Sequence, residues 1–347
     1  MTLNMTELNA LYLDELTHLV TSYGEKPYRA RQIFEWLHIH HASTFDRMTN
    51  LPKPLRERLA EDTCISSLHT VTCQTSKEDA TQKYLFGTQD AQYIESVRMV
   101  YRYGPSVCVS TQVGCRMGCT FCASTIDGLT RNLTAGEMLS QVYRIHEATG
   151  QRVSHVVVMG MGEPFDNYDA LIRFLRLLTA EEGYHMSARN ITVSTCGIVP
   201  KIHAFAKEGL PVTLALSLHA PNQSLREQMM PIAKAYPIEE VIDACVKYFH
   251  VTGRRVTAEY AMAEGVNDTD ACAAQIGHLL KHTGIHVNLI PVNPVRGGNY
   301  VQSGAQTLQR FKNQLENYGI NVTIRRELGR DIDGACGQLR RRYRGNQ

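Results

Sequence analysis

The stretch VSTQVGCRMGCTFCAST, residues 109–125, places Cys115, Cys119 and Cys122 on one short loop. A structural zinc site normally has four protein ligands, and a disulfide framework needs an even number of cysteines in an oxidising compartment. The spacing is neither that of a zinc-ribbon pair nor that of the ferredoxin run. Three thiolates can instead bind three irons of a cubane cluster and leave the fourth iron open to an exchangeable ligand. A zinc ion with a fourth ligand from elsewhere in the chain is the alternative.

The chain around this loop repeats a pattern of strand, polar loop and helix from Ser106 onward. Six apolar strands are expected, at SVCVSTQ, SHVVVMGMGEP, NITVSTCG, VTLALSLHAPN, RRVTAEYAM and HVNLIPVNP. Continuous apolar runs are typical of parallel strands that are buried on both faces. The polar or glycine-rich residues follow the strands, at the position where the active sites of barrels lie. The sequence therefore predicts an α/β fold with a partial, open (βα)6 TIM-like barrel, which we favour over a doubly wound sheet.

The length and composition allow a second, smaller domain. A chain of 347 residues with 43% apolar and 20% charged residues can form one large α/β domain and an accessory one. Helical apolar spacing predicts helices up to about residue 60, and strand-like patterns follow up to about residue 100. We therefore predict an accessory domain over residues 1–100, a barrel core over residues 101–330 and a C-terminal segment with a basic tail over residues 331–347.

Basic residues gather beside aromatic ones in three places, although the net charge of +2 by itself indicates no polyanionic partner. Such patches are typical of nucleic-acid binding, because cations contact phosphates and rings stack on bases. A solvated helix face is the alternative for any one of them. The basic residues are Lys26, Arg29 and Arg31, then Lys53, Arg56 and Arg58, and finally Arg340, Arg341, Arg342 and Arg344.

The sequence indicates a cytoplasmic protein without a membrane partner. No apolar run approaches the length of a membrane span, and no signal-peptide pattern opens the chain. Ten cysteines in a cytosolic chain are expected to be reduced thiols, metal ligands or catalysts rather than structural disulfides. Five of them match no motif and are assigned to packing: Cys64, Cys73, Cys196, Cys245 and Cys272.

The cysteine spacing matches that of the radical S-adenosylmethionine (SAM) superfamily, and GMGEP, residues 160–164, resembles the glycine-rich motif of its second strand. Further motifs narrow the resemblance: RNLTAGE, GMGEPFDN, STCGIVPKI, LSLHAPN, HVNLIPVNPV and DIDGACGQLR. Together, in this order, they are similar to the RlmN/Cfr family of RNA adenine methyltransferases, and to its RlmN branch in particular. The match runs over nearly the whole chain, including KPYRARQIFEWL and MTNLPKPLRERL near the N-terminus.

The resemblance implies a radical SAM methyltransferase. Its three cysteines would bind one [4Fe–4S] cluster together with SAM, which is cleaved to a 5′-deoxyadenosyl radical. The implied product carries a methyl group on C2 of adenine, at adenine 2503 of 23S rRNA in the peptidyl-transferase centre and at adenine 37 of tRNAs. Two SAM molecules are used per turnover, because this electron-poor carbon cannot attack a sulfonium methyl group directly.

The resemblance also implies the partners of the enzyme. The RNA has to present an unstacked base to a buried site, and the N-terminal helices and the basic tail are expected to hold it. The implied partners are 23S rRNA before full ribosome assembly, tRNA and an electron donor such as flavodoxin. We expect a monomer.

Three catalytic residues follow from the resemblance. Cys336 matches the cysteine that is methylated by one SAM and then bonded to adenine through a methylene radical. Cys108 matches the cysteine that attacks Cys336, forms a disulfide and releases the product. Glu95 matches the proton acceptor. Without the family, Glu95 would be an ordinary strand-edge carboxylate and both cysteines would be buried core residues.

The SAM-binding residues are likewise implied by the resemblance. Leu218 is expected to act through its backbone, and His219 could equally be a satisfied histidine at the end of a strand. Cys196 departs from the family pattern, in which a small serine is common at this position. The implied contacts are Gly162, Glu163, Ser194, Ser217, Leu218, His219 and Asn293. Three methionines near the motifs are expected to pack against the cofactor: Met117, Met159 and Met161.

Two alternatives stay open at this point. A Cfr-like enzyme would methylate C8 of the same adenine and make the ribosome resistant to antibiotics, and both branches share the motifs quoted above. A non-catalytic, zinc-stabilised RNA-binding protein would use the three clustered cysteines without depending on Cys336. The position of the SAM-like motifs at strand ends argues against this second alternative, because a simple binding protein does not need them.

Overall fold

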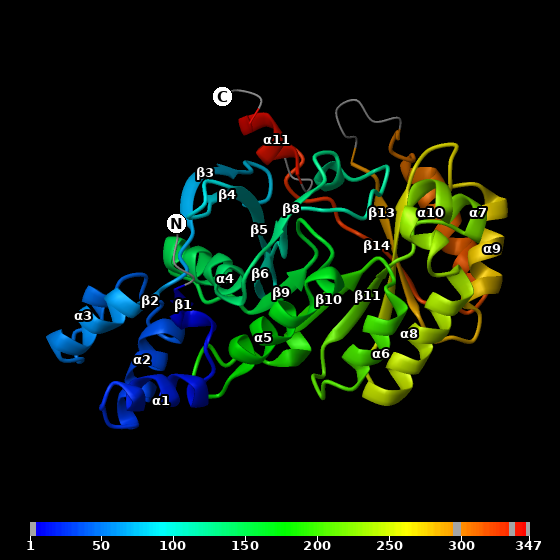
Figure 1. The fold of residues 1–347 in the computed structure, drawn as a ribbon. Helices are drawn as coiled ribbons and strands as arrows, with labels where there is room; N and C mark the ends of the chain where they lie inside the picture. Colours follow the sequence, from blue (N-terminus) through cyan, green and yellow to red (C-terminus); the bar gives the residue numbers. More distant parts are fainter. Residues whose placement is uncertain (1–4, 294–299, 333–336, 345–347) are drawn as a thin grey trace.

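A ten-stranded sheet forms the centre of the computed structural model, which describes residues 5–293, 300–332 and 337–344 (Figure 1). The strand order across the sheet is β14-β13-β12-β11-β10-β9-β6-β5-β4-β3. The strands are β3 (His69–Thr75), β4 (Gln82–Gly87), β5 (Tyr93–Tyr101), β6 (Gly104–Cys108), β9 (His155–Val158), β10 (Ile191–Thr195), β11 (Thr213–Ser217), β12 (Val256–Met262), β13 (His286–Pro291) and β14 (Val322–Ile324).

The parallel part of this sheet confirms the predicted partial barrel. The six predicted strands are β6 and β9 to β13, and each pairs in parallel with the next. β14 continues the parallel run at the edge, where the sequence analysis predicted no strand. On the other side of β6, the strands β5, β4 and β3 are antiparallel. The carboxyl ends of the parallel strands therefore meet at one end of the barrel.

Helices cover the outer face of the parallel strands (Figure 1). α4 begins at a capping box in which Thr134 and Glu137 bond each other's backbone amides, and it ends at Gly150, which has a φ of +63°. Both signals were readable in the sequence. The helices of the barrel are α4 (Ala135–Thr149), α5 (Tyr168–Thr179), α6 (Val199–Ala206), α7 (Gln223–Met229), α8 (Ile238–Thr252), α9 (Asp270–Leu280) and α10 (Ala305–Asn317).

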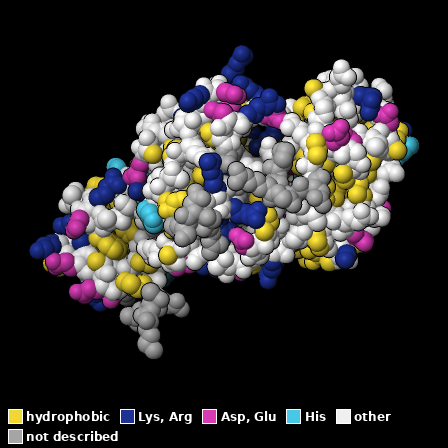
Figure 2. Space-filling model, turned by 90° about the horizontal axis from the view of Figure 1, so that it is seen from above, with side chains coloured by type: hydrophobic (Ala, Val, Ile, Leu, Met, Phe, Trp, Pro, Cys, Tyr) yellow, Lys and Arg dark blue, Asp and Glu magenta, His cyan; other side chains and the backbone are white. Residues whose placement is uncertain are grey.

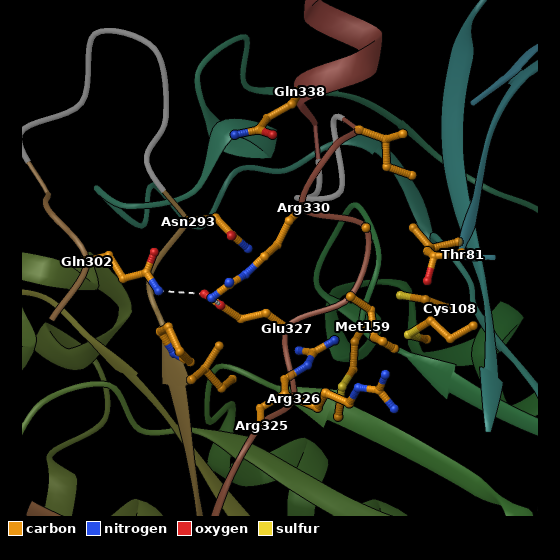
Figure 3. Close-up of a pocket in the computed structure, with 17 residues that line it drawn as sticks. Thr81, Cys108, Met159, Asn293, Gln302, Arg325, Arg326, Glu327, Arg330 and Gln338 are labelled. Atoms are coloured by element: carbon orange, nitrogen blue, oxygen red, sulfur yellow. Dashed lines mark hydrogen bonds and ion pairs between the residues drawn. The ribbon is translucent and has the colours of Figure 1, made fainter. Parts of the chain in front are cut away.

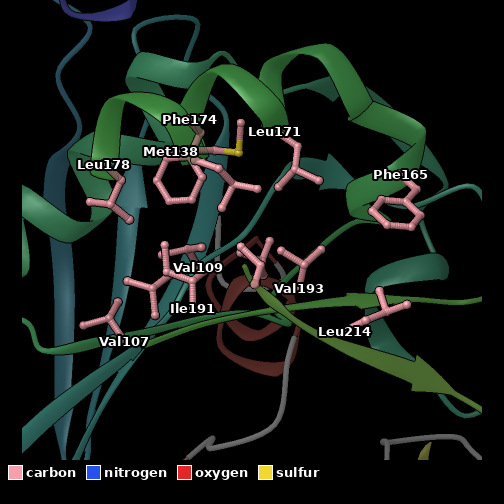
Figure 4. Packing of buried hydrophobic residues seen from close by; sticks show 14 of the residues in the cluster. Val107, Val109, Met138, Phe165, Leu171, Phe174, Leu178, Ile191, Val193 and Leu214 are labelled. Atoms are coloured by element: carbon pink, nitrogen blue, oxygen red, sulfur yellow. The ribbon is translucent and has the colours of Figure 1, made fainter. Parts of the chain in front are cut away.

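The hydrophobic core lies between these helices and the sheet (Figure 4). Phe174 and Leu178 of α5 point down onto Val107 of β6 and Val193 of β10, and all four side chains are fully buried. Burying one such side chain contributes roughly 1.5–3 kcal/mol. This packing fixes the strands, and with them the loops at their carboxyl ends.

The N-terminal helices form a separate group at one end of the molecule (Figure 1). The helices are α1 (Leu13–Ser22), α2 (Tyr28–His38) and α3 (Lys53–Asp62), and β1 (Thr6–Glu7) pairs with β2 (Thr63–Cys64). Arg173 of α5 donates to Glu15 of α1 at 3.0 Å, and His38 of α2 lies 2.9 Å from the hydroxyl of Tyr143 on α4. β3 to β5 pair with the barrel sheet, so one sheet contains strands from both sides of residue 100. The division into domains stays a prediction.

The basic surfaces differ from what the sequence suggests. Four cations of the N-terminal helices, Arg29, Lys53, Arg56 and Arg58, lie 3.6–3.8 Å from a carboxylate. These ion pairs reduce the local positive charge. In the tail, α11 (Gln338–Arg344) leaves Arg341 and Arg342 exposed, but Arg340 is only 3% exposed. The prediction of a basic surface is therefore wrong for Arg340, because its helix packs that side chain inward. In the described ranges, no helix has the length and apolar character needed to cross a bilayer.

Two buried histidines predict that the protein loses stability in mild acid. Burial lowers the pKa of both His38 and His41 to about 3, from an ordinary value of 6.5. Both rings are therefore neutral in the folded protein, and the unfolded chain binds more protons once the pH falls below about 6.5. The contribution of the two histidines to the free energy of unfolding is complete above about pH 6.5 and is lost as the pH falls toward 3. At pH 5 the loss is roughly 2 kcal/mol per histidine.

Melting temperatures measured between about pH 7.5 and pH 5 test this prediction. His38→Gln should show a flatter pH dependence than the wild type, because it removes one of the groups that bind extra protons on unfolding. His18→Gln is the matched control at an exposed position and should keep the wild-type slope. An unchanged slope in His38→Gln would contradict a neutral buried ring.

Candidate active site

The three clustered cysteines lie on the loop of a hairpin at the end of β6. The hairpin strands are β7 (Gln112–Gly114) and β8 (Leu129–Asn132). Gly114 has a φ of +83°, and a Cβ atom there would lie 2.0 Å from the carbonyl oxygen of Gly128. The amide of Cys115 donates to that same oxygen at 3.0 Å. Only glycine therefore fits at position 114, where the end of β7 turns directly into the cysteine loop.

Hydrogen bonds fix the loop between its ends. Thr125 donates its hydroxyl to the carbonyl oxygens of Cys119 and Cys122 at 3.1 and 2.9 Å. Thr120 contacts a different part of the barrel, because its amide donates to the carbonyl oxygen of Met229 at 2.9 Å. These bonds hold the loop both internally and against the chain at Met229.

Cys115, Cys119 and Cys122 all line one cavity of about 220 Å³. The cavity also contains five of the residues that were predicted to bind SAM: Gly162, Glu163, Ser194, Ser217 and His219. Among the described residues, no three side chains of metal-ligating type converge closely enough to bind a single ion. Three thiols on one loop are the donor set of a cubane cluster that leaves its fourth iron open.

The surroundings of the thiols are apolar. Burial raises the pKa of Cys115 to about 12 and also raises that of Cys119. Cysteine binds metals as the thiolate, so metal binding at this loop has to release protons that the thiols otherwise retain.

Glu163 is the best-defined polar residue of the cavity. It follows β9, and Gly162 before it has a φ of +105° and no space for a Cβ atom beside Gln112. The Glu163 carboxylate accepts the amide of Phe165 at 3.1 Å and the amide of Cys196 at 2.8 Å. Burial raises its pKa above the ordinary value. These bonds connect the ends of β9 and β10 and hold the carboxylate at the cavity wall.

The ends of β10 and β11 supply small polar groups to the same cavity. The hydroxyl oxygens of Ser194 and Ser217 lie 3.3 Å apart. Nδ1 of His219 accepts the amide of Ala261 at 3.0 Å, and burial lowers the pKa of this histidine to about 3. His219 is therefore neutral, with its proton on Nε2. Leu218 packs into the hydrophobic core with no exposed surface.

A second cavity, of about 480 Å³, adjoins the first (Figure 3). Met159, Ile290 and Arg325 line both cavities, so the two are neighbours. Cys108 and Asn293 line the larger cavity. Arginines that sequence analysis did not select also line it: Arg325, Arg326 and Arg330.

The larger cavity belongs to the face at which the strands end. Figure 2 looks down on this face, and Lys and Arg side chains border the hollow near its middle. Arg330 pairs with Glu327, which also accepts a hydrogen bond from Gln302. A cavity with three arginines in its wall suits a ligand with an anionic backbone.

Glu95 and the chain after Cys336 meet at the side of this region. Cys336 itself lies outside the described residues, as do residues 333–335. Gly337, the next residue, has a φ of +81°, and a Cβ atom there would lie 2.9 Å from the amide nitrogen of Ser124. The amide of Gly337 donates to Glu95 at 2.6 Å. The segment next to Cys336 is therefore packed against the cysteine loop.

Lys83 was not selected by sequence analysis. Its Nζ lies 2.9 Å from Oε2 of Glu95, and its side chain is fully buried. The available signal was a single charged residue in the strand QKYLFG, since buried lysines are rare unless paired.

Comparison with known proteins connects this geometry to a family. A model described as ribosomal RNA large subunit methyltransferase N-terminal domain matches residues 4–65, and the radical SAM superfamily model matches residues 109–274. The chain is 55% identical to a protein of Lachnospira eligens named probable dual-specificity RNA methyltransferase RlmN, over 98% of this chain and 97% of the relative. A protein of the same name from Geobacillus thermodenitrificans is 53% identical, over 99% and 94%.

A solved structure agrees with these matches. The crystal structure of a radical SAM methyltransferase from Sphaerobacter thermophilus superposes with a TM-score of 0.91 at 46% identity. The match covers 96% of this chain and 98% of that one. The likeness therefore includes the N-terminal helices as well as the barrel.

Proposed function

The chain belongs to the RlmN family of radical SAM RNA methyltransferases, and we propose that it methylates C2 of adenine in both ribosomal and transfer RNA. The proposed targets are adenine 2503 of 23S rRNA and adenine 37 of tRNAs. One observation carries the proposal. The cysteine-lined cavity adjoins a cavity lined by Cys108 and three arginines, and the residue after Cys336 packs against the cysteine loop.

The proposed roles of the smaller cavity follow from its lining. A [4Fe–4S] cluster and SAM supply a 5′-deoxyadenosyl radical when bound. We assign three iron atoms to Cys115, Cys119 and Cys122. The wall formed by Gly162, Glu163, Ser194, Ser217 and His219 would orient SAM, with Leu218 supporting it from the core. The neutral His219 can donate one hydrogen bond from Nε2 without adding charge beside a sulfonium.

The larger cavity supports the proposed covalent steps. Cys336 would carry the transferred methyl group, whose carbon becomes bonded to adenine C2. Glu95 would accept the ring proton of the adduct. Cys108 would then attack the sulfur of Cys336, so that a disulfide forms, the carbon–sulfur bond to the RNA breaks, and the released carbon takes up a proton to become the methyl group. The three arginines are suited to the phosphates next to the target base. Asn293, at the wall of the same cavity, stays a proposed SAM contact. We propose two SAM molecules per turnover, an electron donor such as flavodoxin, and a monomeric enzyme.

Product analysis tests the proposed function. The protein is purified without oxygen and incubated with SAM, reductant and either unmodified 23S rRNA or unmodified tRNA, and the digested RNA is analysed by mass spectrometry. We expect 2-methyladenosine from both RNAs. Cys122→Ala should give none, because it removes a proposed iron ligand, while Cys64→Ala should match the wild type. 8-Methyladenosine would instead place the protein with Cfr-like enzymes, and no methyladenosine from either RNA would overturn the proposed substrates.

A further inference from the structure

The carboxylate of Glu95 accepts three hydrogen bonds inside the protein. Nζ of Lys83 lies 2.9 Å from its Oε2, and the amide of Gly337 donates to that oxygen at 2.6 Å. The amide of Arg340 donates to Oε1 at 2.6 Å. Glu95 is 3% exposed and Lys83 is not exposed at all. This is a buried ion pair whose anion also binds the backbone at the start of α11.

The strand register explains why these groups meet. Lys83 of β4 lies opposite Val97 of β5, and Cys108 of β6 lies opposite Val97 on its other side. Glu95 is two residues before Val97, so its side chain leaves the same face of the sheet. Lys83, Glu95 and Cys108 therefore leave one face of the sheet from three neighbouring strands, and Glu95 binds the start of α11 from that face.

The chain on the other side of residues 333–336 is also held by carboxylates. Asp79 accepts the amide of Gly329 at 2.8 Å, and Asp331 accepts the amide of Lys77 at 2.8 Å. Both bonds connect the C-terminal segment to the turn between β3 and β4. Asp331, which holds the chain before Cys336, is exposed, whereas Glu95, which holds the chain after it, is buried.

We propose that Lys83 and Glu95 form a positioning pair, which holds the start of α11 and thereby sets the place of the chain next to Cys336. Glu95 binds the two amides, and Lys83 supplies the positive charge that a buried carboxylate needs. Either residue alone would leave an uncompensated charge in the interior. The inference rests on the proposed function in one respect, namely that Cys336 carries the methyl group. It adds to Glu95 a role that does not depend on proton transfer.

Limited proteolysis of the anaerobically purified, full-length protein tests the positioning pair without RNA or added SAM. Trypsin can cut after the consecutive arginines of α11 only when that helix detaches, so the rate of cleavage there measures how firmly it is held. We expect cleavage to be at least about tenfold faster in both Lys83→Met and Glu95→Gln. Glu95→Gln weakens the bonds to the two amides, and Lys83→Met leaves an uncompensated buried carboxylate that detachment of α11 would expose to water. Lys77→Met also removes one lysine near this segment, at an exposed position, and should match the wild type.

A double variant keeps the test decisive where a single one folds poorly. Lys83→Met with Glu95→Leu removes both buried charges together, so the fold should recover its melting temperature. The amides of Gly337 and Arg340 still lack their acceptor, so α11 should be cut as fast as in the single variants. Wild-type cleavage in a folded double variant would overturn the proposal.

A second readout separates this inference from the proposed function. In the RNA assay Lys83→Met should lower kcat with little change in KM for RNA, and mass spectrometry should find less S-methylation of Cys336. Faster cleavage of α11 in the variants, together with no methyladenosine from the wild-type enzyme, would leave the positioning pair standing and reject the function. Wild-type cleavage rates in the variants, together with methyladenosine from the wild-type enzyme, would do the reverse.

Discussion

Gly114→Ala is expected to lose the iron–sulfur cluster although it keeps all three cysteines. Gly114 has a φ of +83°, and a Cβ atom there would lie 2.0 Å from the carbonyl oxygen of Gly128. The left-handed conformation alone costs about 1–2 kcal/mol for a residue with a Cβ atom, and the contact with backbone cannot be relieved by a rotamer change. Because that oxygen also accepts the amide of Cys115, the loop has to shift at its first cysteine.

Iron and sulfide content, together with the visible absorbance of the anaerobic protein, measure the effect. We expect Gly114→Ala to bind less than about a tenth of the wild-type iron, since each 1.4 kcal/mol is a factor of ten. Gly128→Ala is the matched control, because Gly128 also has a positive φ, +67°, but its Cβ atom would have nothing within 4 Å. Wild-type iron content in a folded Gly114→Ala variant would show that the loop can bind the cluster in another backbone conformation.

The sequence was sufficient to predict the barrel because its strands are long apolar runs separated by clear helix signals. GMGEP could be placed in the same way, since a polar motif directly after a buried strand has to lie at the carboxyl edge of the sheet. The cysteine loop was recognised by its spacing alone. These are local patterns, and local patterns can be read without knowing which strands are neighbours.

The remaining site residues depend on strand register and on the path of the chain, which no local pattern contains. Lys83 meets Glu95 only because β4 pairs with β5 in one particular register. Arg325 and Arg326 follow β14, a short edge strand that the sequence did not indicate. Glu95 was selected through family resemblance, and its three hydrogen-bond donors became visible only in the fold. Asn293 likewise lines a different cavity from the other predicted SAM contacts.

Met159, Ile290 and Arg325 form the wall that the two adjoining cavities share. The chain before residues 333–336 is anchored at Asp79, and the chain after them is anchored at Glu95. The proposed methyl carrier, Cys336, lies between these two anchors in the sequence.

Cys108→Ala is expected to stop the reaction after the RNA has become bonded to the protein. Cys108 lies on β6, at the wall of the larger cavity, and we propose that it releases the product by attacking the sulfur of Cys336. Without this thiol the carbon–sulfur bond between protein and RNA has no displacing group. Product should fall by roughly 100-fold or more, as when a nucleophile is removed from other enzymes.

Denaturing electrophoresis and mass spectrometry distinguish this block from an earlier one. Cys108→Ala should accumulate a covalent complex that approaches one RNA per protein, whereas Cys336→Ala should form neither complex nor product. Cys64→Ala serves as the control for loss of a thiol and should turn over normally. Near-normal turnover of Cys108→Ala without any complex would mean that another group releases the RNA, and the assignment of Cys108 would then be wrong, whatever the role of Cys336.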